Sequence, residues 1–135
     1  MRTLILDNEA VQALSQPGHD KHRSVVAHLA GVVTRRRKGS AVSVVVPTAV
    51  RVEAAWDRSD PRVPYVNRFR VLDRRLDTPA ANLAAGILGR TGVSVADAHI
   101  GAVAQTLTGD VVILTSDPRD MLRVSAPRSI RAVRI

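Results

Sequence analysis

Short β-branched apolar segments recur along the chain and alternate with stretches that favour helices, and this alternation restricts the fold more than any other feature. Each apolar segment is too short for a helix face and has the composition of a buried strand. The predicted strands are Thr3–Leu6, Ala41–Val46, Val71–Leu76, Val111–Thr115 and Ser129–Ile135. The predicted helices are Asn8–Ser15, His19–Thr34, Thr48–Arg58, Pro64–Arg70, Ala80–Arg90 with Thr78 as its N-cap, Ser94–Leu107, and a short helix from Asp117-Pro118 to Val124. The alternation predicts an α/β fold with a central parallel sheet of four to five strands flanked by helices.

The composition fits a single domain that spans residues 1–135. The chain is 45% apolar, which is enough for a substantial core at this length. It has no cysteine, which excludes disulfides, thiolate catalysis and Cys-based zinc sites. No N-terminal signal is visible, and no apolar stretch approaches the ~20 residues that span a bilayer. We therefore expect a soluble, cytoplasmic protein.

The net charge of +8, from 20 Lys and Arg against 12 Asp and Glu, is compatible with a polyanionic partner. A general enrichment in arginine explains the same charge equally well. Trp56, Tyr65 and Phe69 are the only aromatic residues, whereas base-stacking surfaces are built from such side chains. Any contact with nucleic acid is therefore expected to be mainly with phosphates.

Four acidic residues fall in places where α/β sheets bind ligands. Asp7 directly follows the first predicted strand, and Asp117 follows the fourth. Asp97 lies in the first turn of a predicted helix, and Glu53 lies near the middle of the helix after the second strand. Ligands of open parallel sheets bind outside the carboxyl ends of the strands. We therefore expect these acids to meet at one edge of the sheet.

Taken singly, each acid has a simpler structural interpretation. Asp7 and Asp117 can cap the helices that follow them, Ser94 and Asp97 resemble a capping box, and Glu53 can pair with a surface cation. Taken together, the acids favour a functional site, because the helices around Asp97 and Glu53 are largely apolar and converging carboxylates repel one another. Oxygen ligands without Cys or a His cluster favour Mg²⁺ or Mn²⁺ over zinc.

The ordered set of acids resembles the PIN-domain family, and within it the VapC-type toxins of type II toxin–antitoxin systems. The similarity covers essentially the whole chain and predicts a three-layer PIN-like fold. It rests on four stretches, which are Leu4-Ile5-Leu6-Asp7, Val50-Arg51-Val52-Glu53, Val95-Ala96-Asp97-Ala98-His99-Ile100-Gly101-Ala102 and Leu114-Thr115-Ser116-Asp117-Pro118. The family often has a small or hydroxyl residue after its first Asp, where this chain has Asn8-Glu9.

The resemblance implies a Mg²⁺- or Mn²⁺-dependent endoribonuclease that leaves a 5′-phosphate and a 3′-hydroxyl. It implies that Asp7 and Asp97 are direct metal ligands, that Asp117 serves a second ion or holds water, and that Glu53 orients water or assists proton transfer. Thr115 matches the family's hydroxyl position. The implied partners are an RNA substrate, a cognate VapB-like antitoxin and a second copy of the chain in a homodimer. The candidate RNA-binding arginines are Arg74, Arg75, Arg119 and Arg123, whereas the Arg35–Lys38 run is better explained as a solvated helix end.

Two other functions remain open from the sequence. One is a non-catalytic PIN-like module that binds RNA or protein, although its four acids would then be unused. The other is a phosphoacceptor domain, which also has acids at strand ends but normally needs a lysine late in the sheet. This chain has only Lys21 and Lys38, and neither follows a late strand. The motifs assign no role to Glu9 or Asp120.

Overall fold

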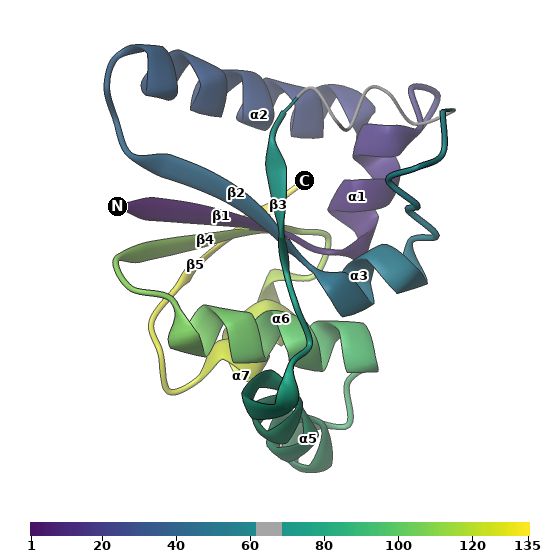
Figure 1. Ribbon diagram of the computed structural model, residues 1–135, viewed down its shortest axis with the longest axis vertical. Coiled ribbons are helices and arrows are strands. Elements are labelled where there is room, and N and C mark those ends of the chain that lie inside the picture. Colours follow the sequence, from purple (N-terminus) through teal and green to yellow (C-terminus); the bar gives the residue numbers. More distant parts are fainter. Residues whose placement is uncertain (62–68) are drawn as a thin grey trace.

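The computed structural model describes residues 1–61 and 69–135, and it has a five-stranded sheet in which every strand is parallel to its neighbours (Figure 1). The strand order is β3-β2-β1-β4-β5. The strands are β1 (Arg2–Leu6), β2 (Val42–Pro47), β3 (Val71–Arg74), β4 (Asp110–Thr115) and β5 (Arg131–Arg134). The predicted α/β class and central parallel sheet are confirmed. Most of the predicted helix Pro64–Arg70 lies outside the described residues.

Helices cover the two faces of the sheet unequally. They are α1 (Asn8–Ser15), α2 (His22–Arg37), α3 (Thr48–Glu53), α5 (Thr78–Thr91), α6 (Val95–Thr106) and α7 (Pro118–Ser125). Figure 1 shows α1 and α2 on one side of the sheet and α6 and α7 on the other, with α5 outside them. From β1 to β2 the chain moves toward one edge of the sheet, and from β4 to β5 it moves toward the other edge. Because crossovers between parallel strands have the same hand, this reversal places α2 and α7 on opposite faces.

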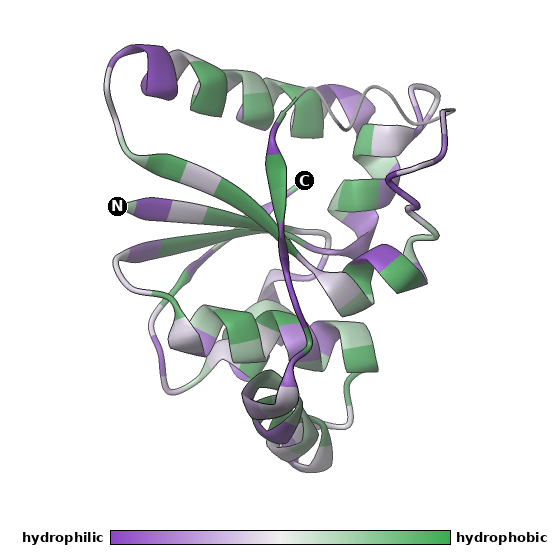
Figure 2. Cartoon of the chain, viewed as in Figure 1, coloured by the Kyte–Doolittle hydropathy of each residue, from purple (hydrophilic) through white to green (hydrophobic). Residues whose placement is uncertain are grey.

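The central strands are apolar because both of their faces are covered. Ile5, Val44 and Ile113 are fully buried at the centre of the core. Figure 2 shows the same pattern, with hydrophobic colours along the inner strands and hydrophilic colours along the exposed parts of the helices. The register aligns Arg2 of β1 with Val42 of β2 and with Asp110 of β4. The aligned strands therefore present their carboxyl ends along a single edge, called the carboxyl edge below.

A close approach between α6 and α7 fixes the helical layer next to this edge. Gly101 lies where a Cβ atom would collide with the backbone carbonyl of Val124. Only a glycine permits this separation, because any side chain would push α7 away. Gln105 strengthens the contact, since its amide nitrogen donates to the carbonyl oxygens of Val124 and Ala126 at 3.2 Å and 3.1 Å. The end of α7 is thereby held against the second half of α6.

Several predicted helix boundaries are wrong. Helix α2 begins and ends about one turn later than His19–Thr34, at His22 and Arg37. Helix α3 ends at Glu53 instead of Arg58, because the chain turns at Ala55, whose φ of 54° is left-handed. The N-cap of α5 is Asp77 instead of Thr78, and its carboxylate accepts from the backbone N–H of Ala80 at 3.0 Å.

A cluster of two arginines around Trp56 fixes the chain after α3. The guanidinium groups of Arg51 and Arg58 lie 5.4 Å and 4.5 Å from the centre of the buried Trp56 ring. Both arginines also donate to the carboxylate of Asp73 on β3, each at 2.9 Å. This arrangement connects the end of α3 to the edge strand of the sheet and leaves Trp56 unavailable for stacking on a base.

Candidate active site

The carboxyl edge of the sheet carries a hollow of about 310 Å³ that is rich in carboxylates. The structure brings the four predicted acids together in its lining, where Asp7, Glu53, Asp97 and Asp117 come from four different segments of the chain. Glu9 and Asp120 line the same hollow. Its remaining lining residues are Asn8, Ser94, Thr115, Ser116 and Met121. We call this hollow the acidic pocket.

Asp7 lies at the centre of the acidic pocket, between β1 and the start of α1. Its side chain is 6% exposed, and one carboxylate oxygen caps α1 by accepting from the N–H of Ala10 at 2.8 Å. The other oxygen accepts from the N–H of Ser116 at 3.3 Å. Burial raises the pKa of Asp7, while the hydrogen bonds from Ala10, Thr115 and Ser116 oppose that rise. The capping interpretation of Asp7 is therefore correct and is compatible with a functional one.

Thr115 and Asp117 are positioned by the end of β4. Thr115 is fully buried, and its hydroxyl accepts from the backbone N–H of Asp117 at 2.9 Å. The same hydroxyl hydrogen-bonds to the carboxylate of Asp7. Asp117 caps α7, because its Oδ1 accepts from the N–H of Asp120 at 3.2 Å. Thr115 thus connects the two acids that follow neighbouring strands.

Asp97 is the acid whose pKa is raised by burial and by the other carboxylates of the acidic pocket. Its backbone N–H donates to the hydroxyl of Ser94 at 3.1 Å, which caps α6, and its carboxylate lines the pocket. Burial, followed by repulsion from Glu53, Asp7, Asp120 and Asp117, raises the pKa of Asp97 to about 6. A shift of this size at a cluster of like charges is typical of functional sites.

Glu53 differs from its predicted place near the middle of a helix, because it is the last residue of α3. The short helix starts directly after β2, so its end projects past the carboxyl edge. Glu53 is exposed and borders the acidic pocket from one side. A carboxylate in this position can change its rotamer at little cost, unlike the buried carboxylate of Asp7.

The two acids without a predicted role have local partners. The carboxylate of Glu9 lies 3.1 Å from Nε2 of His19 and 3.8 Å from Nζ of Lys21. Asp120 lies 3.5 Å from a guanidinium nitrogen of Arg123 on the same helix. Both acids line the acidic pocket, so each interaction moderates its negative charge. Their signal in the sequence was weak, because Glu9 and Asp120 lie inside helices instead of at strand ends.

None of the four candidate RNA-binding arginines lines the acidic pocket. Arg74 and Arg75 are exposed at the end of β3, and Arg119 is exposed in the first turn of α7. Arg123 is partly engaged, since it donates to the carbonyl oxygen of Thr91 at 2.5 Å and pairs with Asp120. The first three are therefore freer than Arg123 to contact a phosphate.

His99 is a structural residue in this arrangement. Its ring is fully buried, and Nδ1 accepts from the backbone N–H of Ala49 at 3.3 Å, which connects α6 to the first turn of α3. Burial lowers the pKa of His99 and favours the neutral ring that this bond requires. His99 is therefore packed between α6 and α3 and does not line the acidic pocket.

The donor set of the acidic pocket suits a hard divalent cation. All its acidic groups offer oxygen ligands, and the raised pKa of Asp97 reflects negative charge that a cation would neutralise. Within residues 1–61 and 69–135, no three His, Asp or Glu side chains converge closely enough to form a complete protein cage.

The fold and the acidic pocket define an α/β protein with a PIN-like fold, and solved structures share that fold over nearly its whole length. "Structure of FitAB bound to IR36 DNA fragment" has a TM-score of 0.57 at 17% identity and covers 97% of this chain and 94% of its own. "Crystal Structure of FitAcB from Neisseria gonorrhoeae" has a TM-score of 0.55 at 17% identity, with coverages of 96% and 95%.

VapBC2 from Rickettsia felis, bound to a DNA fragment from its promoter, has a TM-score of 0.58 at 9% identity and covers 98% of both chains. No family model and no curated protein sequence matches this chain. The resemblance to the PIN-domain family is thus confirmed at the level of the fold. In the described part of the chain, no helix is long and apolar enough to span a membrane.

Proposed function

We propose that this protein is a Mg²⁺- or Mn²⁺-dependent endoribonuclease toxin that a cognate antitoxin neutralises. The observation that carries the proposal is the convergence of Asp7, Glu53, Asp97 and Asp117 in one pocket at the carboxyl edge of a PIN-like fold. The structural neighbours FitAB, FitAcB and VapBC2 are toxin–antitoxin complexes, which supports an antitoxin as the partner. A homodimer is part of the same proposal.

In this proposal the acids divide the work according to burial. Asp7 and Asp97 hold the ion, since Asp7 is oriented by three hydrogen bonds and Asp97 is repelled by four neighbouring carboxylates. Asp117 and Glu53 lie at the exposed margin, where they can orient water or accept a proton. When bound, the cation would polarise the scissile phosphodiester and stabilise the charge that develops on it.

Thr115 acts as a positioning residue, because its hydroxyl contacts Asp7 and the backbone of Asp117 and is fully buried. The carboxylates themselves repel RNA, so cations around the pocket have to offset them. Arg74, Arg75 and Arg119 serve this role in the proposal, and Arg123 contributes less because of its internal bonds.

A cleavage assay on a structured RNA mixture tests the catalytic part of the proposal. The wild type should cleave RNA with Mg²⁺ or Mn²⁺ and stop on addition of EDTA. Asp7→Asn and Asp97→Asn should each lower the rate by about a hundredfold or more, as expected for loss of an ion-holding carboxylate. The matched control is Asp110→Asn, because Asp110 is an exposed acid at the opposite ends of the strands.

A non-catalytic binding module is the second candidate, and one observation favours it. Among the described residues no ready three-ligand metal cage exists, so the ion would have to recruit water or move side chains. Calorimetric titration with Mg²⁺ and Mn²⁺ distinguishes the two candidates. Saturable binding that is lost in Asp97→Asn supports the nuclease, and no binding at millimolar ion concentration supports the module.

A further inference from the structure

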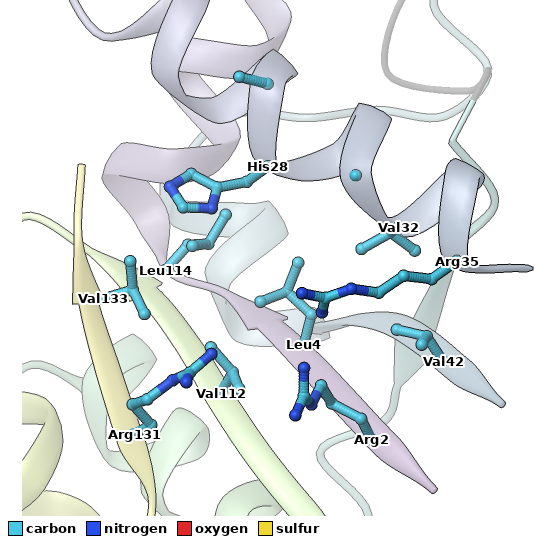
Figure 3. A pocket seen from close by; sticks show the side chains of 12 residues that line it. Arg2, Leu4, His28, Val32, Arg35, Val42, Val112, Leu114, Arg131 and Val133 are labelled. Carbon is cyan, nitrogen blue, oxygen red and sulfur yellow. The ribbon is translucent and has the colours of Figure 1, made fainter. Parts of the chain in front are cut away.

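A second hollow, of about 320 Å³, lies between α2 and the sheet, and we call it the basic groove. Its floor is apolar and includes Leu4, Val112 and Leu114, and its helical wall includes Gly31 and Val32. The lining also includes the basic side chains of Arg2, His28, Arg35 and Arg131. Figure 3 shows the side chains of Arg2, Arg35 and Arg131 extending over the floor toward a shared space.

The basic groove is separate from the acidic pocket. The groove runs across the sheet from Arg2 and Val42, the first residues of β1 and β2, to Leu114 of β4. The acids lie at the carboxyl edge. The two hollows have no lining residue in common. A ligand in the groove therefore does not occupy the proposed active site.

The groove lies where α2 approaches strands β1, β4 and β5 without filling the space above them. Helix α1 packs beside α2 on the same side and contacts β1 and β4 (Figure 1). The floor of the groove is apolar and largely buried, since Leu4 and Val112 are each 6% exposed, and the side chains of Arg2, Arg35 and Arg131 extend over it (Figure 3). The charged ends of these side chains gather over an apolar surface.

The arginine side chains of the groove have few partners among the described residues. Within that part of the chain, the guanidinium groups of Arg35 and Arg131 make no hydrogen bond or ion pair. Arg2 reaches a carboxylate only at 4.0 Å, that of the 79% exposed Asp110. No Asp or Glu is among the described residues that line the groove. Like charges held together in this way favour an anionic ligand.

We propose that the basic groove binds an acidic, amphipathic segment of a partner protein, with its apolar side chains on the floor and its carboxylates against Arg2, Arg35 and Arg131. The arginines attract the carboxylates of the segment by charge complementarity. The apolar floor favours a peptide over a nucleic acid, because a peptide can place apolar side chains on it. No Phe, Tyr or Trp among the described residues lines the groove for base stacking. Its volume is at the lower end of ligand sites, which run from ~300 to ~1,000 Å³, so it fits a few side chains of a short segment.

Gly31 offers a way to block the groove without unfolding the protein. It lies inside α2 and lines the groove, and a Cβ atom added there meets nothing within 4 Å. Gly31→Leu therefore places a side chain in the groove while improving the helix propensity of α2. A loss of binding in this variant would follow from occlusion of the groove, with no change of charge.

Fluorescence anisotropy with a fluorescein-labelled peptide of sequence Glu-Leu-Leu-Glu-Asp-Leu-Leu-Glu tests the proposal on the full chain. The wild type should bind it saturably, and Arg35→Glu with Arg131→Glu should weaken binding by about tenfold or more. Gly31→Leu should weaken it by a similar factor. The charge-matched control is Arg37→Glu with Arg90→Glu, because both arginines are exposed and outside the groove. It should change the affinity by no more than about twofold, as rim charges do.

Three results would overturn the proposal. The first is equal weakening in the control, which would mean that net charge alone attracts the peptide. The second is undiminished binding of a peptide with every leucine replaced by serine, since the apolar floor would then be irrelevant. The third is preferential displacement by a single-stranded RNA oligomer in the wild type but not in Arg35→Glu with Arg131→Glu, which would make the groove a nucleic-acid site. If Gly31→Leu cleaves RNA at the wild-type rate, blocking the basic groove does not impair the proposed active site, and the two sites are functionally separate.

Discussion

The buried hydroxyl of Thr115 accepts from the backbone N–H of Asp117 at 2.9 Å and also hydrogen-bonds to the carboxylate of Asp7. One side chain therefore connects the acids that follow β1 and β4. This relationship explains why the pocket needs a hydroxyl residue at the end of a strand that is otherwise apolar. It also makes Thr115 a sensitive point for both stability and the geometry of the proposed site.

Thr115→Val should lower the free energy of unfolding by about 1–3 kcal/mol, because it keeps the shape but leaves the N–H of Asp117 and an oxygen of Asp7 without their partner. Thr115→Ser restores the hydroxyl and should recover most of the loss. Urea unfolding of the three proteins measures the difference. Equal stability of Thr115→Val and wild type would show that water replaces the hydroxyl.

Asp97→Asn should stabilise the metal-free protein above about pH 6. The pKa of Asp97 is raised from 3.8 to about 6 in the folded protein, so the folded state holds this proton more tightly than the unfolded state does. Stability therefore falls as pH rises through this window, and the cost is complete above it. The partial solvent exposure of the carboxylate reduces the expected gain to about 1–2 kcal/mol.

Urea unfolding of wild type and Asp97→Asn in EDTA, at a series of pH values on both sides of the window, measures this gain. The two proteins should differ least below pH 3.8, where Asp97 is protonated in both the folded and the unfolded state. A gain that is independent of pH would mean that packing, and not ionisation, causes the stabilisation.

Addition of Mg²⁺ or Mn²⁺ should raise the melting temperature of the wild type, because an ion that binds only the folded state stabilises it by about 1.4 kcal/mol at ten times its dissociation constant. Asp7→Asn combined with Asp97→Asn should lose this response. Asp110→Asn should keep it, since Asp110 lies at the amino ends of the strands. The measurement is a thermal melt with and without the ion, at constant ionic strength.

Two glycines in helices should respond to alanine with opposite signs. Gly101→Ala should destabilise the protein by about 2 kcal/mol or more, because the added Cβ meets the carbonyl of Val124. Gly31→Ala should stabilise it by about 0.5–1 kcal/mol, since its Cβ meets open space. Chemical unfolding of both variants tests the packing of α6 on α7 and the openness of the basic groove together.

Asp73→Ala should lower stability by about 1 kcal/mol, because Arg51 and Arg58 both donate to its partly exposed carboxylate. Added salt should reduce the loss, since these ion pairs are screened at the surface. A double-mutant cycle with Arg51→Ala isolates the interaction. Additive losses would mean that the Arg51–Asp73 ion pair contributes nothing to stability and would contradict this prediction.

The central strands and the meeting of the acids could be predicted because they follow from local rules. A β-branched run such as Val42–Val46 fits only a covered strand, and parallel strands bring Asp7 and Asp117 to one edge. The end of α3 could not be predicted, because Ala55 adopts a left-handed conformation that its residue type does not favour. That error misplaced Glu53 within its helix.

Contacts between residues far apart in the chain could not be predicted from the sequence for a different reason. The arginines of the basic groove come from β1, α2 and β5, and only the folded sheet brings Arg2, Arg35 and Arg131 together. The same holds for Glu9 and Asp120, whose roles in the pocket depend on where α1 and α7 begin in space. Arg36, predicted to be part of a solvated run, instead donates to the carbonyl oxygen of Val42 at 2.9 Å.

The strand order has a consequence for the protein during its synthesis. Strand β1 pairs with β4, so the centre of the sheet is complete only after Val112, the partner of Leu4, has been synthesised. Asp7 and Asp117 therefore come together only after most of the chain has left the ribosome. A nascent chain that stops before β4 has the first acid but no partner strand to complete the acidic pocket. If the proposed activity is harmful to RNA, this order of assembly keeps unfinished chains harmless.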